Sequence, residues 1–183
     1  TIKGNADRML SREETMVSPY LEDEMSKITP VVNTNGSDSA MLDNTLEFFV
    51  MNGMPLPLAV MITIPEPWSN NKAMEQEKKD FYQYYATMME PWDGPASILF
   101  SDGDIMGAVL DRNGLRPSRY YITNDGYLIL SSEVGALPID ESRIKVKDRL
   151  HPGKMLLVDT VKGELIDDDK LKEQYATKQP YGE

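Results

Sequence analysis

Asp38 is the first side chain in the sequence whose type and position could bind a substrate. It ends the turn Asn35-Gly36-Ser37-Asp38, directly before a segment with helical periodicity. Backbone amides at a helix start keep a carboxylate ionised, so Asp38 could bind the ammonium group of a small amino acid. Ser37 and Asp38 are also both good helix N-caps. The spacing alone favours the cap and leaves the ligand as the alternative.

A second group of polar side chains lies in residues 111–117, which read Asp-Arg-Asn-Gly-Leu-Arg-Pro. Arg112 and Arg116 lie close to Asp111 and could bind an anion. They could equally form a structural loop in which the arginines satisfy buried carbonyl and carboxylate groups. The residues favour neither interpretation. Glu133, at the end of a predicted strand, could pair with one of these arginines.

Several kinds of active site lack their essential residues here. The chain has no Cys and a single His, His151. A cysteine nucleophile, a thiolate metal site and a disulfide are therefore excluded within this chain, and a Ser-His-Asp triad has little to build on. His151 precedes Pro152-Gly153 in a turn, which indicates a structural role. The sequence contains neither of the two Gly-rich phosphate-binding patterns, the Walker pattern and Gly-x-Gly-x-x-Gly. The acidic runs at 22–24 and 167–169 lack a calcium-loop spacing and are expected to be solvated faces.

The composition is that of an ordinary globular domain. The sequence has 183 residues, is 40% hydrophobic and carries a formal net charge of −11. An acidic chain repels phosphate backbones, which argues against nucleic acid as the main partner, and no apolar run is long enough to span a membrane. The first residue is Thr1, so we expect a fragment or a processed chain. An N-terminal Thr nucleophile is the less favoured alternative.

Helical signals dominate up to about residue 90, and strand signals follow. Helices are expected at 6–10, 20–28, 39–52, 58–64 and 73–89. The helix at 73–89 carries a stripe of aromatic residues, which indicates that this side packs in the core. Strands are expected at 97–100, 105–110, 120–123, 127–130 and 154–161, separated by turns such as Asp102-Gly103 and Asn124-Asp125-Gly126. A terminal helix is expected at 165–176. Helices followed by an antiparallel meander predict an α+β fold.

Four blocks of the sequence resemble the glutaminase domain of the large subunit of glutamate synthase. They are residues 35–44 (NGSDSAMLDN), 89–96 (MEPWDGPA), 110–120 (LDRNGLRPSRY) and 131–135 (SSEVG). They occur in the order that the family has. The resemblance covers residues 1–179, and residues 180–183 are expected to begin a linker to the next domain.

The resemblance implies a class II glutamine amidotransferase with the fold of N-terminal nucleophile hydrolases, in which two antiparallel sheets lie between helical layers. The family's Cys nucleophile, its oxyanion hole and the Arg that binds the glutamine carboxylate all lie upstream of the part seen here. Thr1 to Asn5 look like the segment directly after the oxyanion motif. The chain therefore resembles the C-terminal half of the domain, with no catalytic residue of its own, and is expected to be inactive alone.

One substrate contact carries over from the resemblance. Asp38 matches the aspartate that binds the α-amino group of glutamine, with Gly36 and Ser37 in the adjacent loop. The resemblance thus reverses the preference for a plain cap. The polar residues of the 111–117 segment and Glu133, by contrast, match a structural signature of the family's sheet. They are Asp111, Arg112, Asn113, Gly114, Arg116 and Glu133.

The resemblance also implies partners. FMN and an iron–sulfur cluster are expected in other domains of the parent enzyme, with no cofactor or metal in this chain. The expected partners are glutamine, the missing N-terminal half and the synthase domain, with self-association of the fragment and no nucleic acid or membrane. The expected location is cytoplasmic. The alternative is a non-catalytic module that binds an amino acid or docks on another subunit.

Overall fold

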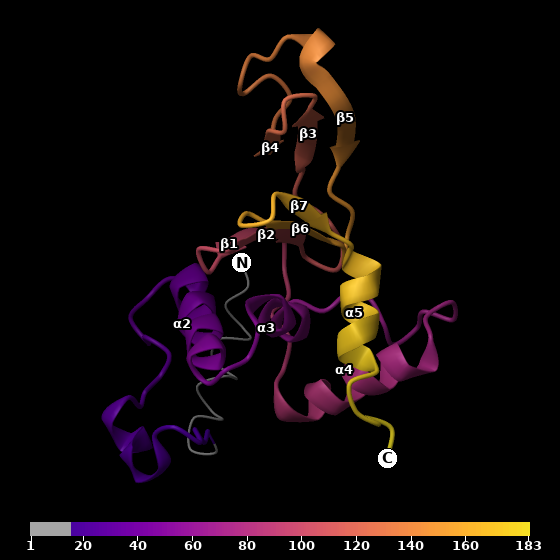
Figure 1. Ribbon diagram of the computed structural model, residues 1–183. Helices are drawn as coiled ribbons and strands as arrows, with labels where there is room; N and C mark the ends of the chain where they lie inside the picture. The colour runs from indigo at the N-terminus through magenta and orange to yellow at the C-terminus, as the bar shows by residue number, and fades with distance from the viewer. Residues whose placement is uncertain (1–15) are drawn as a thin grey trace.

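The computed structural model describes residues 16–183, so the helix expected at 6–10 lies outside the described residues. The α+β class is confirmed: a layer of helices lies against one antiparallel sheet, and a second antiparallel sheet extends from the other side (Figure 1). The helical elements are the 3-10 helices η2 (Glu22–Lys27) and η3 (Glu141–Arg143) and the α-helices α2 (Asp38–Met51), α3 (Leu56–Thr63), α4 (Gln76–Met88) and α5 (Asp168–Ala176). The strands are β1 (Ser97–Ser101), β2 (Ile105–Leu110), β3 (Arg119–Thr123), β4 (Leu128–Ser131), β5 (Ile144–Arg149), β6 (Met155–Asp159) and β7 (Glu164–Ile166).

The strands do not form the single meander that the sequence predicts. The first sheet has the order β1-β2-β6-β7 and the second has the order β4-β3-β5, with every pairing antiparallel. The chain leaves the first sheet after β2, builds the whole second sheet, and returns as β6 beside β2. The Arg-Pro loop at 111–118 is therefore the connection from one sheet to the other.

Two further expectations are wrong at the level of single elements. The helix expected from residue 165 begins at Asp168, because Glu164–Ile166 pair with β6 and the side chain of Asp167 caps the helix by accepting from the Lys170 N–H. The segment at 20–28 contains only the 3-10 helix η2. Strand β5 and helix η3 were not expected at all.

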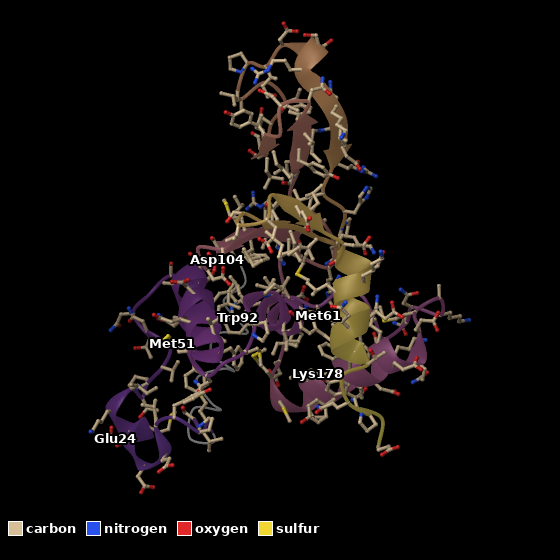
Figure 2. The ribbon with its side chains drawn as sticks, viewed as in Figure 1. Glu24, Met51, Met61, Trp92, Asp104 and Lys178 are labelled. Carbon is tan, nitrogen blue, oxygen red and sulfur yellow. The ribbon has the colours of Figure 1, made fainter. Side chains whose placement is uncertain are left out.

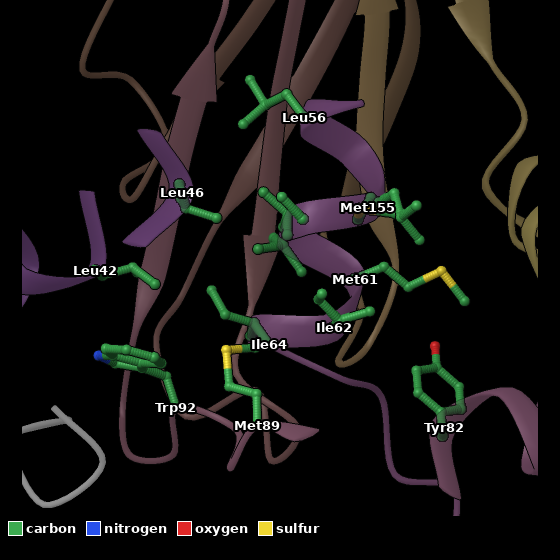
Figure 3. Close-up of a cluster of buried hydrophobic side chains, with 14 of the residues drawn as sticks. Leu42, Leu46, Leu56, Met61, Ile62, Ile64, Tyr82, Met89, Trp92 and Met155 are labelled. Atoms are coloured by element: carbon green, nitrogen blue, oxygen red, sulfur yellow. The ribbon is translucent and has the colours of Figure 1, made fainter. Parts of the chain in front are cut away.

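The core lies between the helices and one face of the first sheet. Helix α3 is buried along its whole length, which fits its unbroken run of apolar residues. It packs against α2 through Leu42 and Leu46, and against β6 through Met155, with Trp92 and Met89 closing one end (Figure 3). The packing against the sheet is tight: a Cβ on Gly107 would lie 2.3 Å from the Phe100 ring.

The opposite face of the first sheet is apolar and only partly covered. The register places Leu99, Met106 and Leu165 on this face, together with Ala108 and Leu156, which pack in a small cluster with Leu130 and Leu150. Leu99 is 68% exposed, Met106 54% and Leu165 51%. A face of this kind is usually covered by another layer in a folded domain.

A buried lysine ties α5 to α4 and to the sheet. Lys172 is only 2% exposed, and its Nζ lies 3.3 Å from Glu66 Oε1 and 3.1 Å from Asp168 Oδ2. It also donates a hydrogen bond to the Gly153 carbonyl. The Tyr82 hydroxyl of α4 donates to Glu66 at 2.8 Å, and burial together with the Glu66 charge raises the pKa of Tyr82 well above its ordinary value.

The acidic partner Asp168 also binds the sheet directly. Its Oδ1 accepts from the backbone N–H of Met155 at 3.1 Å, at the start of β6. The run at 167–169 is therefore not the solvated face that the sequence indicated, because Asp167 caps α5, Asp168 joins the buried cluster and Asp169 pairs with Lys154. The buried ion cluster, defined as Lys172, Glu66 and Asp168, fixes the helical layer behind the sheet.

We expect Lys172→Met to lower the free energy of unfolding by about 3 kcal/mol, because Glu66 and Asp168 would lose their nearest counter-charge in a buried place. Each carboxylate would keep only a more distant lysine, Lys78 or Lys154, at 3.7 Å. Lys170→Met, on the exposed side of the same helix, should change it by less than about 0.5 kcal/mol. Urea unfolding of both variants measures the difference. Equal stabilities would show that the buried ion cluster does not hold the helical layer in place.

Candidate functional site

The loop before α2 is built by its own polar side chains. The Asn33 side chain accepts from the backbone N–H of Asn35 at 3.0 Å, and the Asn44 side chain accepts from that of Asn33 at 3.0 Å. Gly36 lies close to this turn, since a Cβ there would meet the Asn33 carbonyl oxygen at 3.1 Å and Ala40 Cβ at 3.2 Å. The loop thus arrives at the helix in one defined conformation.

Ser37, and not Asp38, is the N-cap of α2. Its backbone is extended and its Oγ accepts from the Ala40 N–H at 3.3 Å. Asp38 is the first helical residue, half-buried, and its carboxylate makes no hydrogen bond or ion pair with any residue of 16–183. The interpretation of Asp38 as the N-cap is therefore wrong, and its charge lies in the first turn at the positive end of the helix.

A groove runs along the same helix beside Asp38. It has a volume of about 650 Å³ and lies between α2 and the edge strand β1. Ser39, Asp43 and Glu47 line the α2 side, and residues 97–102 line the other. Ser39 begins the groove, and its Oγ lies 3.0 Å from Ser37 Oγ. Figure 2 shows Asp104, in the β1–β2 turn, near this end of α2. The three carboxylates of the lining, Asp43, Glu47 and Asp102, give the groove an affinity for cationic groups such as an ammonium.

The Arg-Pro loop is held by a buried carboxylate. Asp111 is 2% exposed and accepts from the backbone N–H groups of Ala96 at 3.1 Å and Asn113 at 3.0 Å. Arg112 forms an ion pair with Asp93, from the loop that carries Trp92. These contacts fasten the crossing between the two sheets to the end of β1. Sequence reasoning missed Asp93, although the block at 89–96 contains it.

The pairing of Glu133 with an arginine of this loop is wrong. Arg112 takes Asp93 as its partner, and among residues 16–183 no ion pair joins Arg116 or Glu133 to an opposite charge. Glu133 follows β4, which is the strand of the second sheet farthest from β5, and its backbone N–H donates to Ser131 Oγ at 3.2 Å. The end of β4 nevertheless lies beside the end of the loop, because Ser131 pairs with Arg119 at the start of β3.

Asp38 and the Arg-Pro loop lie at opposite ends of the β1–β2 hairpin. Asp102, at one end, lines the groove together with Ser39, whereas the Asp111 N–H donates to the Ala96 carbonyl at the other end. Five residues of strand separate the two ends by about 16 Å. The structure thus does not join these sequence candidates into one site, and the arginines do not reach a ligand on Asp38.

Two structural searches of residues 16–183 bear on other kinds of function. That part of the chain contains no group of three or more acidic or His side chains arranged to hold a metal ion. It also contains no helix that is both long and apolar enough to span a bilayer.

Comparison with known proteins decides the family. The sequence matches the family of class II glutamine amidotransferases over residues 1–183. The chain belongs to this family. The fold expected from the resemblance, helices with antiparallel sheets, agrees with this assignment.

The similar curated proteins are glutamate synthases. The chain is 50% identical over 181 residues to the NADPH glutamate synthase large chain of Bacillus subtilis, and 48% identical over 182 residues to the NADH glutamate synthase of Saccharomyces cerevisiae. It is 44% identical over 185 residues to a chloroplastic ferredoxin-dependent glutamate synthase of Arabidopsis thaliana. These alignments cover 99%, 99% and 100% of this chain but only 12%, 8% and 11% of those proteins.

Gly114 tests whether the crossing loop is as tightly built as its contacts indicate. It has φ +60, and a Cβ there would lie 2.3 Å from Pro152 Cγ. Gly114→Ala should therefore cost about 2–4 kcal/mol, from backbone strain and overpacking together. Gly126→Ala is the matched control, since its φ is +87 but nothing lies within 4 Å. It should cost only the strain, about 1–2 kcal/mol. Equal losses in thermal unfolding would contradict the tight contact with Pro152.

Proposed function

We propose that this chain forms the C-terminal part of the glutaminase domain of a glutamate synthase and that Asp38 binds the α-amino group of glutamine there. The observation that carries the proposal is the Asp38 carboxylate, which stands at the start of α2 with no hydrogen bond or ion pair to residues 16–183, while Ser37 performs the capping. A carboxylate in that position offers a charge-assisted hydrogen bond to an ammonium group. The family membership supports glutamine as the molecule that carries it.

The exposed apolar face of the first sheet supports a partial domain. Leu99, Met106 and Leu165 lie on it and are at least half exposed, whereas Ala108 and Leu156 of the same face pack against Leu130 and Leu150. In the family's fold a second sheet faces the first, so a face of this kind fits the layer that the N-terminal half would complete. Without that layer, the apolar face favours self-association of the isolated chain.

The hydrolysis itself needs groups that this chain does not contain. In the proposed parent enzyme a Cys thiolate attacks the side-chain amide of glutamine, and the acyl-enzyme that forms is then hydrolysed. This sequence has no Cys. Its share of the work is to hold the substrate ammonium at Asp38 and thereby orient the amide. The released ammonia would serve glutamate synthesis from 2-oxoglutarate in a synthase domain, where FMN and an iron–sulfur cluster are bound.

The purified chain should accordingly release no glutamate from glutamine, because its sequence contains no Cys to act as the family's nucleophile. A coupled glutamate assay with heat-denatured chain as the blank measures this. Glutamate release that disappears when the chain is denatured would refute the claim that hydrolysis needs groups outside this chain.

Asp38→Asn in a full-length protein that carries this chain tests the ligand role. Loss of a charge-assisted contact should weaken glutamine binding by roughly tenfold to a hundredfold. Stability should change little, because the Ser37 cap is untouched. Ser37→Ala is the matched control: it should lower the free energy of unfolding by about 1 kcal/mol through the lost cap. Calorimetric titration with glutamine and thermal unfolding separate the two effects.

A structural role for Asp38 would give a different result. If Asp38→Asn left the affinity for glutamine unchanged and instead lowered the melting temperature as much as Ser37→Ala, Asp38 would be a structural residue. That result would contradict the proposal that Asp38 binds the α-amino group of glutamine.

A further inference from the structure

The second sheet extends away from the helices (Figure 1). Several basic side chains lie on one of its faces. Arg119 of β3 is paired with Arg149 of β5, and Tyr121 is paired with Lys147, so these four side chains point to the same side of the sheet. Lys145 lies further along β5, unpaired at a register irregularity between the Ile122–Val146 and Thr123–Ile144 pairs. All four cationic side chains are exposed, whereas Tyr121 beneath them is 9% exposed.

These four cations have no ion pair with any residue of 16–183, in contrast to basic residues nearby. Arg143, just before β5, pairs with Asp125. The acidic residue of β5, Asp148, points to the other face, where it lies near Tyr120 and His151. The Lys147 ammonium lies only over the Tyr121 ring, 5.6 Å from its centroid. A chain with a net charge of −11 thus leaves four neighbouring cations unneutralised.

The pairing of Arg119 with Arg149 is unfavourable in itself. Like charges directly opposite each other on adjacent strands destabilise a sheet. Neither arginine has an acidic neighbour across the strand, because Arg119 faces Ser131 on its other side. An arrangement of this kind is relieved when carboxylates bind over it.

Strand β5 also has an open backbone edge. It is the last strand in the order β4-β3-β5, and no described strand pairs with its outer side. Its outward N–H and C=O groups can therefore pair with an added strand. Lys147 and Arg149 lie in regular pairing, about 7 Å apart along that edge, which is the spacing of alternate residues in any extended segment.

We propose that this basic edge, defined as Arg119, Lys145, Lys147 and Arg149, binds an extended acidic segment of a partner protein that adds to β5 as a further strand. Alternate carboxylates of the segment would match alternate cations of β5 in register. One phosphate group could not span cations spread over about 14 Å. A second copy of the chain fits less well, because none of its described strands carries acidic side chains at alternate positions.

The test is a fluorescence-anisotropy titration of the 183-residue chain with a labelled octapeptide of alternating Glu and Thr. We expect saturable binding that weakens as salt is added. The triple variant R119Q/K147Q/R149Q should weaken it by at least about tenfold. The control variant K72Q/K170Q/K178Q removes three exposed cations without an ion pair in residues 16–183 and should stay within about twofold. A peptide with four Glu followed by four Thr should bind more weakly, because its charges lose the register.

Three results would overturn the proposal. The first is an absence of binding, which would mean that the lysines only protect the edge against aggregation. The second is an equal loss of affinity in both triple variants, which would mean that the attraction is not local. The third is tighter binding of a single-stranded oligonucleotide than of the acidic peptide. The circular dichroism and unfolding transition of R119Q/K147Q/R149Q should remain those of the unaltered chain, since removing Arg119 relieves a repulsion.

Discussion

A single buried ammonium group, that of Lys172, holds the described elements in their places. Burying a charge costs several kcal/mol unless partners surround it, and here Glu66, Asp168 and the Gly153 carbonyl do so. These partners come from the connection after α3, from α5 and from the turn before β6. Only one arrangement of the helices satisfies them together, and that arrangement presses α3 against the sheet and α2 against α3. The position of Asp38 at the start of α2 therefore depends on contacts made at the far side of the molecule.

The start of α2 separates two tasks that a single aspartate could have combined. Ser37 uses a neutral hydroxyl to satisfy the helix terminus, and the charged side chain one residue later is left for a ligand. The groove beside it adds Asp43 and Glu47, so the surroundings attract cations rather than a whole zwitterion. In the proposed enzyme the carboxylate of glutamine must find its cation elsewhere, which agrees with the distance between Asp38 and the Arg-Pro loop. Binding one end of the substrate is thus a role that a partial domain can keep.

Elements with a clean local pattern were predictable from the sequence, and elements fixed by distant contacts were not. The apolar α3, the periodic α2 and strand β2 were expected within a few residues of their bounds. Strand β5 was missed because four of its six residues, in Ile144–Arg149, are charged, and only its pairing with β3 makes it a strand. Lys172 looked like any lysine on an amphipathic helix, since the residues that bury it lie about 20 and 100 positions earlier. The choice of Ser37 over Asp38 as the cap depends on backbone angles, which composition does not encode.

The most direct test is the structure of a full-length protein that carries this chain, determined with glutamine bound. The deciding quantity is the distance from the glutamine α-amino nitrogen to the nearer carboxylate oxygen of Asp38. The account predicts about 2.7–3.0 Å, the length of a charge-assisted hydrogen bond, with Ser37 still capping α2. An ammonium group held by another carboxylate, with Asp38 more than about 4 Å away, would contradict it.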